Sequence, residues 1–170
     1  MTDPFKTLVV PYKHCDHPPT LVINGDKWGV SAGTLNVCEK YLNRFDVLLN
    51  LTYKPVRQHH KIPIPELKRF ERIDRFVELL LDWPDMGVTR LSLKFWQELI
   101  KWLQAREYKM LVCCVGGHGR TGTAIASLMV AMGSAPEDAI DWVHDHYCRK
   151  AIETQGQQNY IINLVKTRKE

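Results

Sequence analysis

Residues 109–133 restrict the fold more than any other part of the sequence. They begin with a short apolar stretch, KMLVCCV, pass through a glycine-rich turn and continue as GRTGTAIASLMVAMG. The apolar stretch has the length of a buried strand. The last segment is small and apolar on nearly every side, which predicts a helix buried in the middle of a domain and closed by Gly133. The turn between them therefore lies where a strand ends and a helix begins.

The rest of the chain alternates between strand and helix patterns. Residues 20–30 predict two short strands about an Asn-Gly-Asp turn. Buried strands are expected within 45–53 and 75–83, where the apolar runs are too short for typical helices. Helical spacing of apolar residues occupies 32–45 and, more clearly, the amphipathic segment 89–106.

Two helix starts are expected near the C-terminus. Ser134 with Glu137, and Thr154 with Gln157, fit the capping-box pattern, so helices are expected to begin close to residues 135 and 155. The resulting order predicts an α/β fold, with a central, mostly parallel sheet flanked by helices. We expect residues 1–170 to form a single domain, and ligands to bind beyond the carboxyl ends of the strands.

Composition narrows the setting. The chain has 170 residues, 45% of them hydrophobic, with a formal charge of +4 that suits an anionic partner without requiring nucleic acid. No signal peptide or membrane span is recognisable, and five scattered cysteines indicate free thiols, so a cytoplasmic protein is expected. We expect no cofactor and no metal site, although His14, Cys15 and His17 are close enough in sequence to bind an ion adventitiously.

The glycine-rich turn has the chemistry of an anion site. Gly116, Gly117 and Gly119 remove side chains, so that successive backbone N–H groups can point into one concavity at a helix N-terminus. Arg120 adds a planar guanidinium that can contact two oxygens of a tetrahedral oxyanion.

Cys114 lies at the base of this predicted cradle. The N–H dipoles, the helix N-terminus and the arginine all favour the thiolate form, which makes Cys114 a candidate nucleophile. The alternative is that Cys113 and Cys114 are small apolar residues at the end of a buried strand. We accept that reading for Cys113, because strand alternation points one of the pair away from the turn.

A candidate proton donor is found in LDWPDMGV. Asp85 follows Pro84 and precedes Gly87, in a turn that is able to carry the carboxyl over the cradle as a general acid. The simpler alternative is an ordinary type I turn, for which Pro-Asp-x-Gly is common.

Together these segments resemble the cysteine-dependent protein tyrosine phosphatase superfamily, and in particular its small dual-specificity members. CCVGGHGRTG is similar to the family's phosphate-binding loop, DWPDMGV to its acid loop and AIETQGQQNYI to its glutamine loop. The resemblance implies that Cys114 is the nucleophile, Arg120 the transition-state clamp, Asp85 the acid and then base, Thr121 the hydroxyl that steadies the thiolate, and Gln157 the residue that positions water. It also implies a phosphate-binding loop made of Val115, Gly116, Gly117, His118, Gly119 and Arg120.

Three features depart from the family pattern. Cys113 stands where the family usually has histidine, and Glu153 where tyrosine-specific members have the first glutamine. Gln157 is then the remaining amide, unless it serves as the capping-box partner. His118 is able to bind a second anionic group, but a solvent-facing loop histidine is the simpler expectation.

The sequence therefore predicts a phosphate monoester hydrolase that works through a phosphocysteine intermediate on phosphotyrosine or phosphoserine/threonine proteins. Two alternatives stay open. One is a phosphatase of a non-protein substrate, such as an inositol phosphate, a phosphoinositide or an RNA 5' phosphate. The other is a catalytically silent module that holds a phosphorylated partner.

Overall fold

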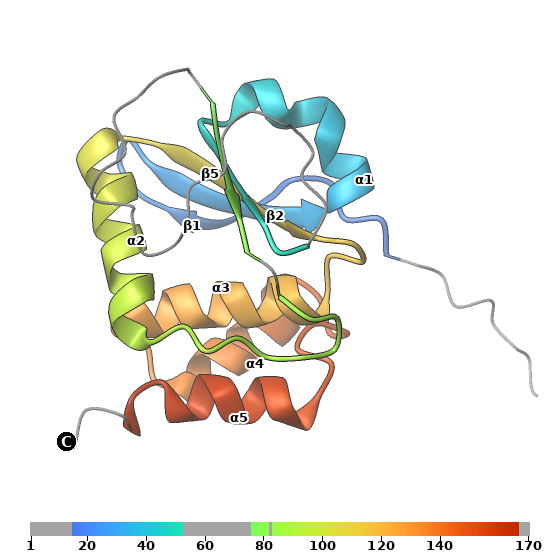
Figure 1. Ribbon diagram of the computed structural model, residues 1–170, viewed down its shortest axis with the longest axis vertical. Coiled ribbons are helices and arrows are strands. Elements are labelled where there is room, and N and C mark those ends of the chain that lie inside the picture. The colour runs from blue at the N-terminus through green and yellow to red at the C-terminus, as the bar shows by residue number, and fades with distance from the viewer. Residues whose placement is uncertain (1–14, 53–75, 82, 167–170) are drawn as a thin grey trace, which may run out of the picture.

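The structure, a computed structural model, describes residues 15–52, 76–81 and 83–166 (Figure 1). Within these residues one sheet has five strands in the order β1-β2-β5-β3-β4. The first two strands are antiparallel, and all other neighbours are parallel. The strands are β1 (Thr20–Asn24), β2 (Gly29–Thr34), β3 (Val47–Asn50), β4 (Val77–Leu80) and β5 (Lys109–Cys114).

Helices cover both faces of this sheet. Leu35 and Cys38 of α1 and Leu42 of η1 pack with Leu48 and Cys113 against one face. The larger core lies on the other face, between the sheet and helices α2 and α3. Figure 1 shows α3 between the sheet and the pair α4 and α5. The helices are α1 (Leu35–Cys38), η1 (Glu39–Arg44), α2 (Leu93–Arg106), α3 (Gly119–Ala131), α4 (Pro136–His146) and α5 (Gln155–Asn163).

Helix α3 has the central position that its composition predicts. Nearly all its residues are buried, and the two hydroxyls of Thr123 and Ser127 bond to carbonyls one turn earlier, at 2.7 Å each. A Cβ atom at Gly122 would lie 2.6 Å from the Cβ of Ala151, so the helix needs a glycine where the chain passes closest. Gly133, with a φ of +109°, ends it as expected.

One of the two predicted caps is wrong. Helix α4 is capped by Ala135 and begins at Pro136, without a side-chain cap. The backbone N–H of Ser134 instead donates to Met129 and so helps to close α3. Proline at the first helical position needs no partner for a missing N–H, so α4 begins without the serine. The capping box of Thr154 and Gln157 is present at the start of α5.

The predicted fold class is confirmed: a mostly parallel sheet lies between helices in one α/β domain. Its extent over all of 1–170 stays a prediction, since residues 1–14, which include His14, and residues 53–75, 82 and 167–170 lie outside the described residues. Of the helices that the structure describes, none is long and apolar enough to cross a membrane.

Candidate active site

The glycine-rich loop connects the end of β5 to the start of α3. Gly117 has a φ of +72°, and a Cβ atom there would lie 2.8 Å from Thr34 Oγ1. Two hydroxyls hold the loop: Thr34 donates to the carbonyl of Gly116 at 3.2 Å, and Tyr147 donates to that of Gly117 at 2.7 Å. With these carbonyls bonded to the surrounding protein, the loop has its other N–H groups to offer an anion, while that of Gly119 is hydrogen-bonded to Glu153.

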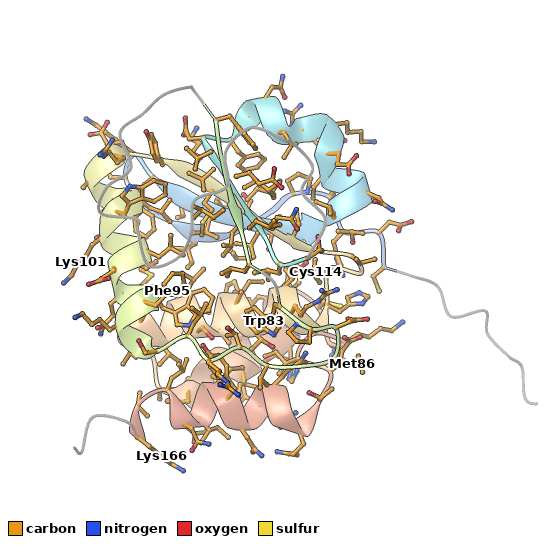
Figure 2. All side chains as sticks on the ribbon, viewed as in Figure 1. Trp83, Met86, Phe95, Lys101, Cys114 and Lys166 are labelled. Carbon is orange, nitrogen blue, oxygen red and sulfur yellow. The ribbon has the colours of Figure 1, made fainter. Side chains whose placement is uncertain are left out.

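The two adjacent cysteines have different surroundings, as strand alternation predicts. Cys114 is buried at the loop's base and belongs to the larger core (Figure 2). Cys113 belongs to the smaller core on the opposite face, together with Cys38. Burial, followed by the contact with Cys38, raises the pKa of the Cys113 thiol well above its usual range. Cys113 therefore has the surroundings of an inert structural thiol.

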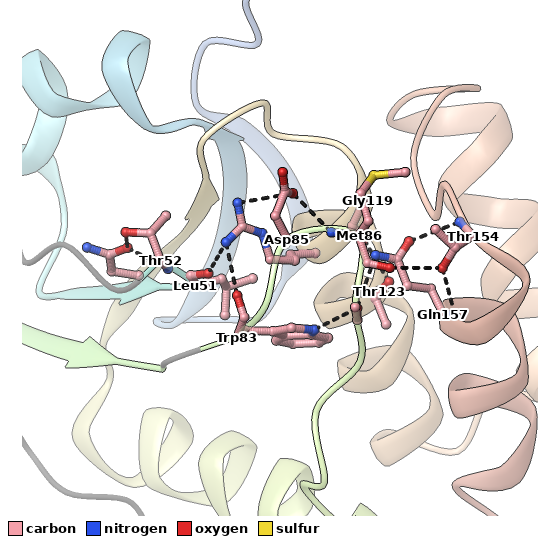
Figure 3. Close-up of polar contacts among 12 residues, drawn as sticks. Leu51, Thr52, Trp83, Asp85, Met86, Gly119, Thr123, Thr154 and Gln157 are labelled. Atoms are coloured by element: carbon pink, nitrogen blue, oxygen red, sulfur yellow. Dashed lines mark hydrogen bonds and ion pairs between the residues drawn. The ribbon is translucent and has the colours of Figure 1, made fainter.

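Arg120 is held by carbonyls at the ends of two other strands. Its Nη1 donates to the carbonyl of Leu51, after β3, at 2.9 Å, and to that of Trp83, beyond β4, at 3.0 Å (Figure 3). The side chain is buried, and its Nε has no hydrogen-bond partner among the described residues. The guanidinium is thus fixed in position through Nη1, which leaves the N–H groups of Nε and Nη2 for an oxyanion.

Asp85 reaches Arg120 from the tip of a tight turn. Gly87 N–H donates to the Pro84 carbonyl at 3.0 Å, and Asp85 Oδ1 lies 3.3 Å from Arg120 Nη2. The alternative of an ordinary type I turn is wrong, because Met86 has a φ of +57° where that type requires a negative value. The turn instead carries the carboxylate over the loop that begins at Cys114.

We call residues 84–87 the acid turn. Helix α5 and its N-cap residue hold this turn in position (Figure 3). Thr154 donates to the Met86 carbonyl at 3.3 Å, and Gln157 Nε2 donates to the Gly87 carbonyl at 3.2 Å. Gln157 Oε1 accepts from the backbone N–H groups of Glu153, at 2.8 Å, and Thr154, at 3.2 Å. The amide is therefore occupied by the cap and the turn, and only its second Nε2 hydrogen remains for a water molecule.

Glu153 brings a second carboxylate to the site. Partial burial raises its pKa, and the negative charge of Asp85 adds to the shift. The Gly119 N–H and the charge of Arg120 act in the opposite direction. From the sequence, Glu153 was recognised only as standing where tyrosine-specific members have a glutamine. Its proximity to Asp85 was not predicted.

Three residues of the predicted site differ in exposure. His118 is 4% exposed, so the expectation of a solvent-facing histidine is wrong; its ring meets that of His17 edge to face, with centroids 5.1 Å apart. Val115 is the exposed side chain of the loop, at 60%. Thr121 is buried, and its Oγ1 has no hydrogen-bond partner in the described part of the chain.

The sequence missed Thr34 and Tyr147. Each supports the loop from a segment distant in sequence, at the end of β2 and just after α4, and neither belongs to a recognisable motif.

Comparison with known proteins relates most of the chain to one family. Residues 50–160 match the family described as Swiss Army Knife protein, DSP-PTPase phosphatase domain. Two uncharacterized proteins of Methanocaldococcus jannaschii are 36% and 35% identical over 72 and 71 residues, which is 42% of this chain in each case. The match spans 44% and 47% of those relatives, a little under half their length.

Solved structures share the fold. Tk-PTP in its active form is 24% identical, with a TM-score of 0.58 over 87% of this chain and 97% of that one. A human DUSP28 variant is 18% identical, with a TM-score of 0.58 over 89% and 99% of the two chains. PTPMT1 in complex with PI(5)P is 18% identical, with a TM-score of 0.54 over 81% and 90%.

Proposed function

The chain belongs to the DSP-PTPase phosphatase family of the Swiss Army Knife proteins, and we propose that it hydrolyses phosphate monoesters through a phosphocysteine intermediate on Cys114. One observation carries the proposal: Asp85 and Arg120, 35 positions apart, meet at 3.3 Å over the loop that begins at Cys114. A nucleophile, an oxyanion clamp and a proton donor thus converge in one site.

Substrate binding begins with the phosphoryl oxygens. The loop N–H groups and the Nε and Nη2 of Arg120 receive them, while the carbonyls of Leu51 and Trp83 keep the guanidinium in place. Because the carboxylate of Asp85 contacts Nη2, it has to give way to the incoming phosphate. In doing so it comes to lie beside the leaving group.

The first chemical step transfers the phosphoryl group to the protein. The Cys114 thiolate attacks phosphorus and forms an S–P bond, while the P–O bond to the leaving group breaks. Asp85 gives its proton to the departing oxygen. The buried hydroxyl of Thr121 is the group that we propose steadies the Cys114 sulfur.

The second step returns Cys114 to its starting state. Asp85, now a carboxylate, takes a proton from a water molecule whose oxygen attacks phosphorus. The S–P bond breaks, the electron pair returns to sulfur and inorganic phosphate leaves. We propose that Gln157 acts mainly by holding the acid turn, and that its remaining Nε2 hydrogen is what it offers to this water.

The substrate class that we propose is a phosphorylated protein, with phosphotyrosine or phosphoserine/threonine as the target. In the loop, the outward-facing side chain is the apolar Val115, while His118 is buried, so that no basic side chain is added beside Arg120. This supports a monoester with few additional charges over an inositol phosphate. None of the five cysteines, all of which lie within the described residues, forms a disulfide, and this supports a cytoplasmic setting.

Turnover on a substrate panel tests this function. The wild-type protein is assayed on phosphotyrosine and phosphoserine peptides, PI(5)P, an inositol phosphate and 5'-phosphorylated RNA, each in the presence of a chelator. Preference for the peptides, and a phosphoryl adduct on Cys114 in rapidly quenched samples, are expected. A preference for the lipid or the RNA would show that the proposed substrate class, a phosphorylated protein, is wrong. Binding without turnover on any substrate would identify a silent module.

A further inference from the structure

A second group of reactive side chains includes His118 of the glycine-rich loop. Cys15, His17, His118 and Cys148 each offer one ligand atom, and these four atoms all lie within 4.8 Å of one another. The residues come from the segment before β1, the loop before α3 and the chain just after α4. We call them the Cys2His2 cluster.

The contacts within the cluster are pairwise. The thiols of Cys15 and Cys148 are hydrogen-bonded to each other. The rings of His17 and His118 meet edge to face at 5.1 Å. His17 Nε2 is shielded from solvent and has no hydrogen-bond partner among the described residues. A shielded imidazole nitrogen without a partner is poorly satisfied by the protein alone.

This set of donors is the one that zinc prefers in closed sites. With Zn–S bonds of about 2.3 Å and Zn–N bonds of about 2.0 Å, a tetrahedral ion keeps its ligand atoms roughly 3.3 to 3.8 Å apart. Atoms already within 4.8 Å of one another need only small rotamer changes to reach that spacing. We propose that the Cys2His2 cluster binds one Zn²⁺ ion.

Binding balances charge within the site. Each of Cys15 and Cys148 loses its thiol proton to solvent, and the two thiolates neutralise the charge of the ion, while His17 and His118 bind as neutral imidazoles. Four protein ligands leave no open position for a substrate, so the ion is structural. Because His118 lies between Gly117 and Gly119, the ion ties the phosphate-binding loop to the segment just before β1 and to the chain just after α4.

Sequence spacing pointed to only part of this site, namely Cys15 and His17, which with His14 are close enough in sequence to bind an ion adventitiously. Cys15 and His17 are separated by one residue, but His118 and Cys148 follow far along the chain, so no zinc-ligand motif is present.

The test uses Cys114→Ser protein, so that the active-site thiol cannot bind the metal and loss of catalysis does not affect the result. Reduced protein is titrated with Zn²⁺ against a chromophoric chelator, and with Co²⁺ while its absorption spectrum is recorded. We expect one ion per chain, sulfur-to-cobalt charge-transfer bands and tetrahedral visible bands. We also expect a higher melting temperature with Zn²⁺.

Matched variants separate the cluster from other metal-binding groups. Adding Cys15→Ser and Cys148→Ser should abolish the charge-transfer bands, and His17→Gln should weaken binding. His146→Gln, which changes an exposed histidine stacked on Trp142, should leave binding unchanged. Circular dichroism checks that each variant is folded.

Two outcomes would overturn the proposal. One is the absence of stoichiometric binding by reduced, folded protein. The other is equal binding by the double cysteine variant.

Discussion

Asp85 and Arg120 form an ion pair of 3.3 Å in which the carboxylate is 78% exposed and the guanidinium is 5% exposed. The arginine is fixed by the carbonyls of Leu51 and Trp83, whereas the aspartate lies at the tip of a surface turn. Because the carboxylate keeps most of its contact with water, the ion pair contributes little to stability. The pair is therefore better understood as a resting position that an incoming phosphate replaces.

Replacing Cys114 by serine should abolish turnover and preserve phosphate binding. The cradle consists of backbone N–H groups and Arg120, neither of which needs the sulfur. The measurement is turnover of an aryl phosphate together with calorimetric binding of phosphate. Activity that survives in Cys114→Ser would refute the nucleophile assignment.

Arg120→Lys should severely reduce turnover, because an ammonium group cannot replace a planar fork that contacts two carbonyls and a phosphate at once. The value of kcat/KM on the same aryl phosphate is the measurement. Wild-type activity in this variant would contradict the role of Arg120 as the clamp.

Asp85→Asn should affect substrates according to their leaving groups. Loss of a general acid typically costs about 10²-fold or more when the leaving oxygen needs a proton, and less when it departs unaided. We expect a drop of at least about 100-fold for phosphotyrosine and a smaller drop for a nitrophenyl ester. Equal losses for the two substrates would argue against proton donation by Asp85.

Glu153 should make anion binding depend on pH. Its pKa is raised, so in the pH range between the ordinary glutamate value and the raised one the site gains a proton and loses a negative charge as pH falls. Sulfate, which does not titrate in this range, should bind more tightly as pH falls. Glu153→Gln should bind sulfate more tightly at neutral pH and lose part of this dependence.

Isothermal titration of sulfate against pH checks this prediction. It is best done in Asp85→Asn protein, with and without Glu153→Gln, so that Asp85 does not contribute to the pH profile. Superimposable profiles for the two proteins would show that Glu153 does not influence the anion site.

Gln157→Ala should reduce both stability and catalysis. It removes the reciprocal bond of the capping box, with a cost of about 1 kcal/mol, and releases the Gly87 carbonyl. The control is Ser92→Ala, which removes the cap of α2 and should cost a similar free energy of unfolding. If turnover of phosphotyrosine falls equally in both variants at matched stability, the proposal that Gln157 holds the acid turn is wrong.

Local chemistry determined much of what the sequence predicted correctly. The glycines of the loop, the apolar composition of α3 and the alternation of Cys113 and Cys114 each act over a few residues, so their consequences can be predicted without knowing the fold. The capping box of Thr154 and Gln157 is local in the same way. Ser134 fits the same pattern but fails, because the closing turn of α3 uses its backbone and Pro136 begins the next helix.

Tertiary structure alone decided how these parts meet. The carbonyls that hold Arg120 follow β3 and β4, and the hydroxyls that hold the loop come from Thr34 and Tyr147. His118 is buried because it meets His17, and Glu153 approaches Asp85 because α5 packs beside the acid turn. The sequence by itself thus determined which residues carry chemistry, since that depends on residue type and local backbone. Their partners were decided by the packing of distant segments, because hydrogen bonds and desolvation depend on distances in space that no sequence spacing encodes.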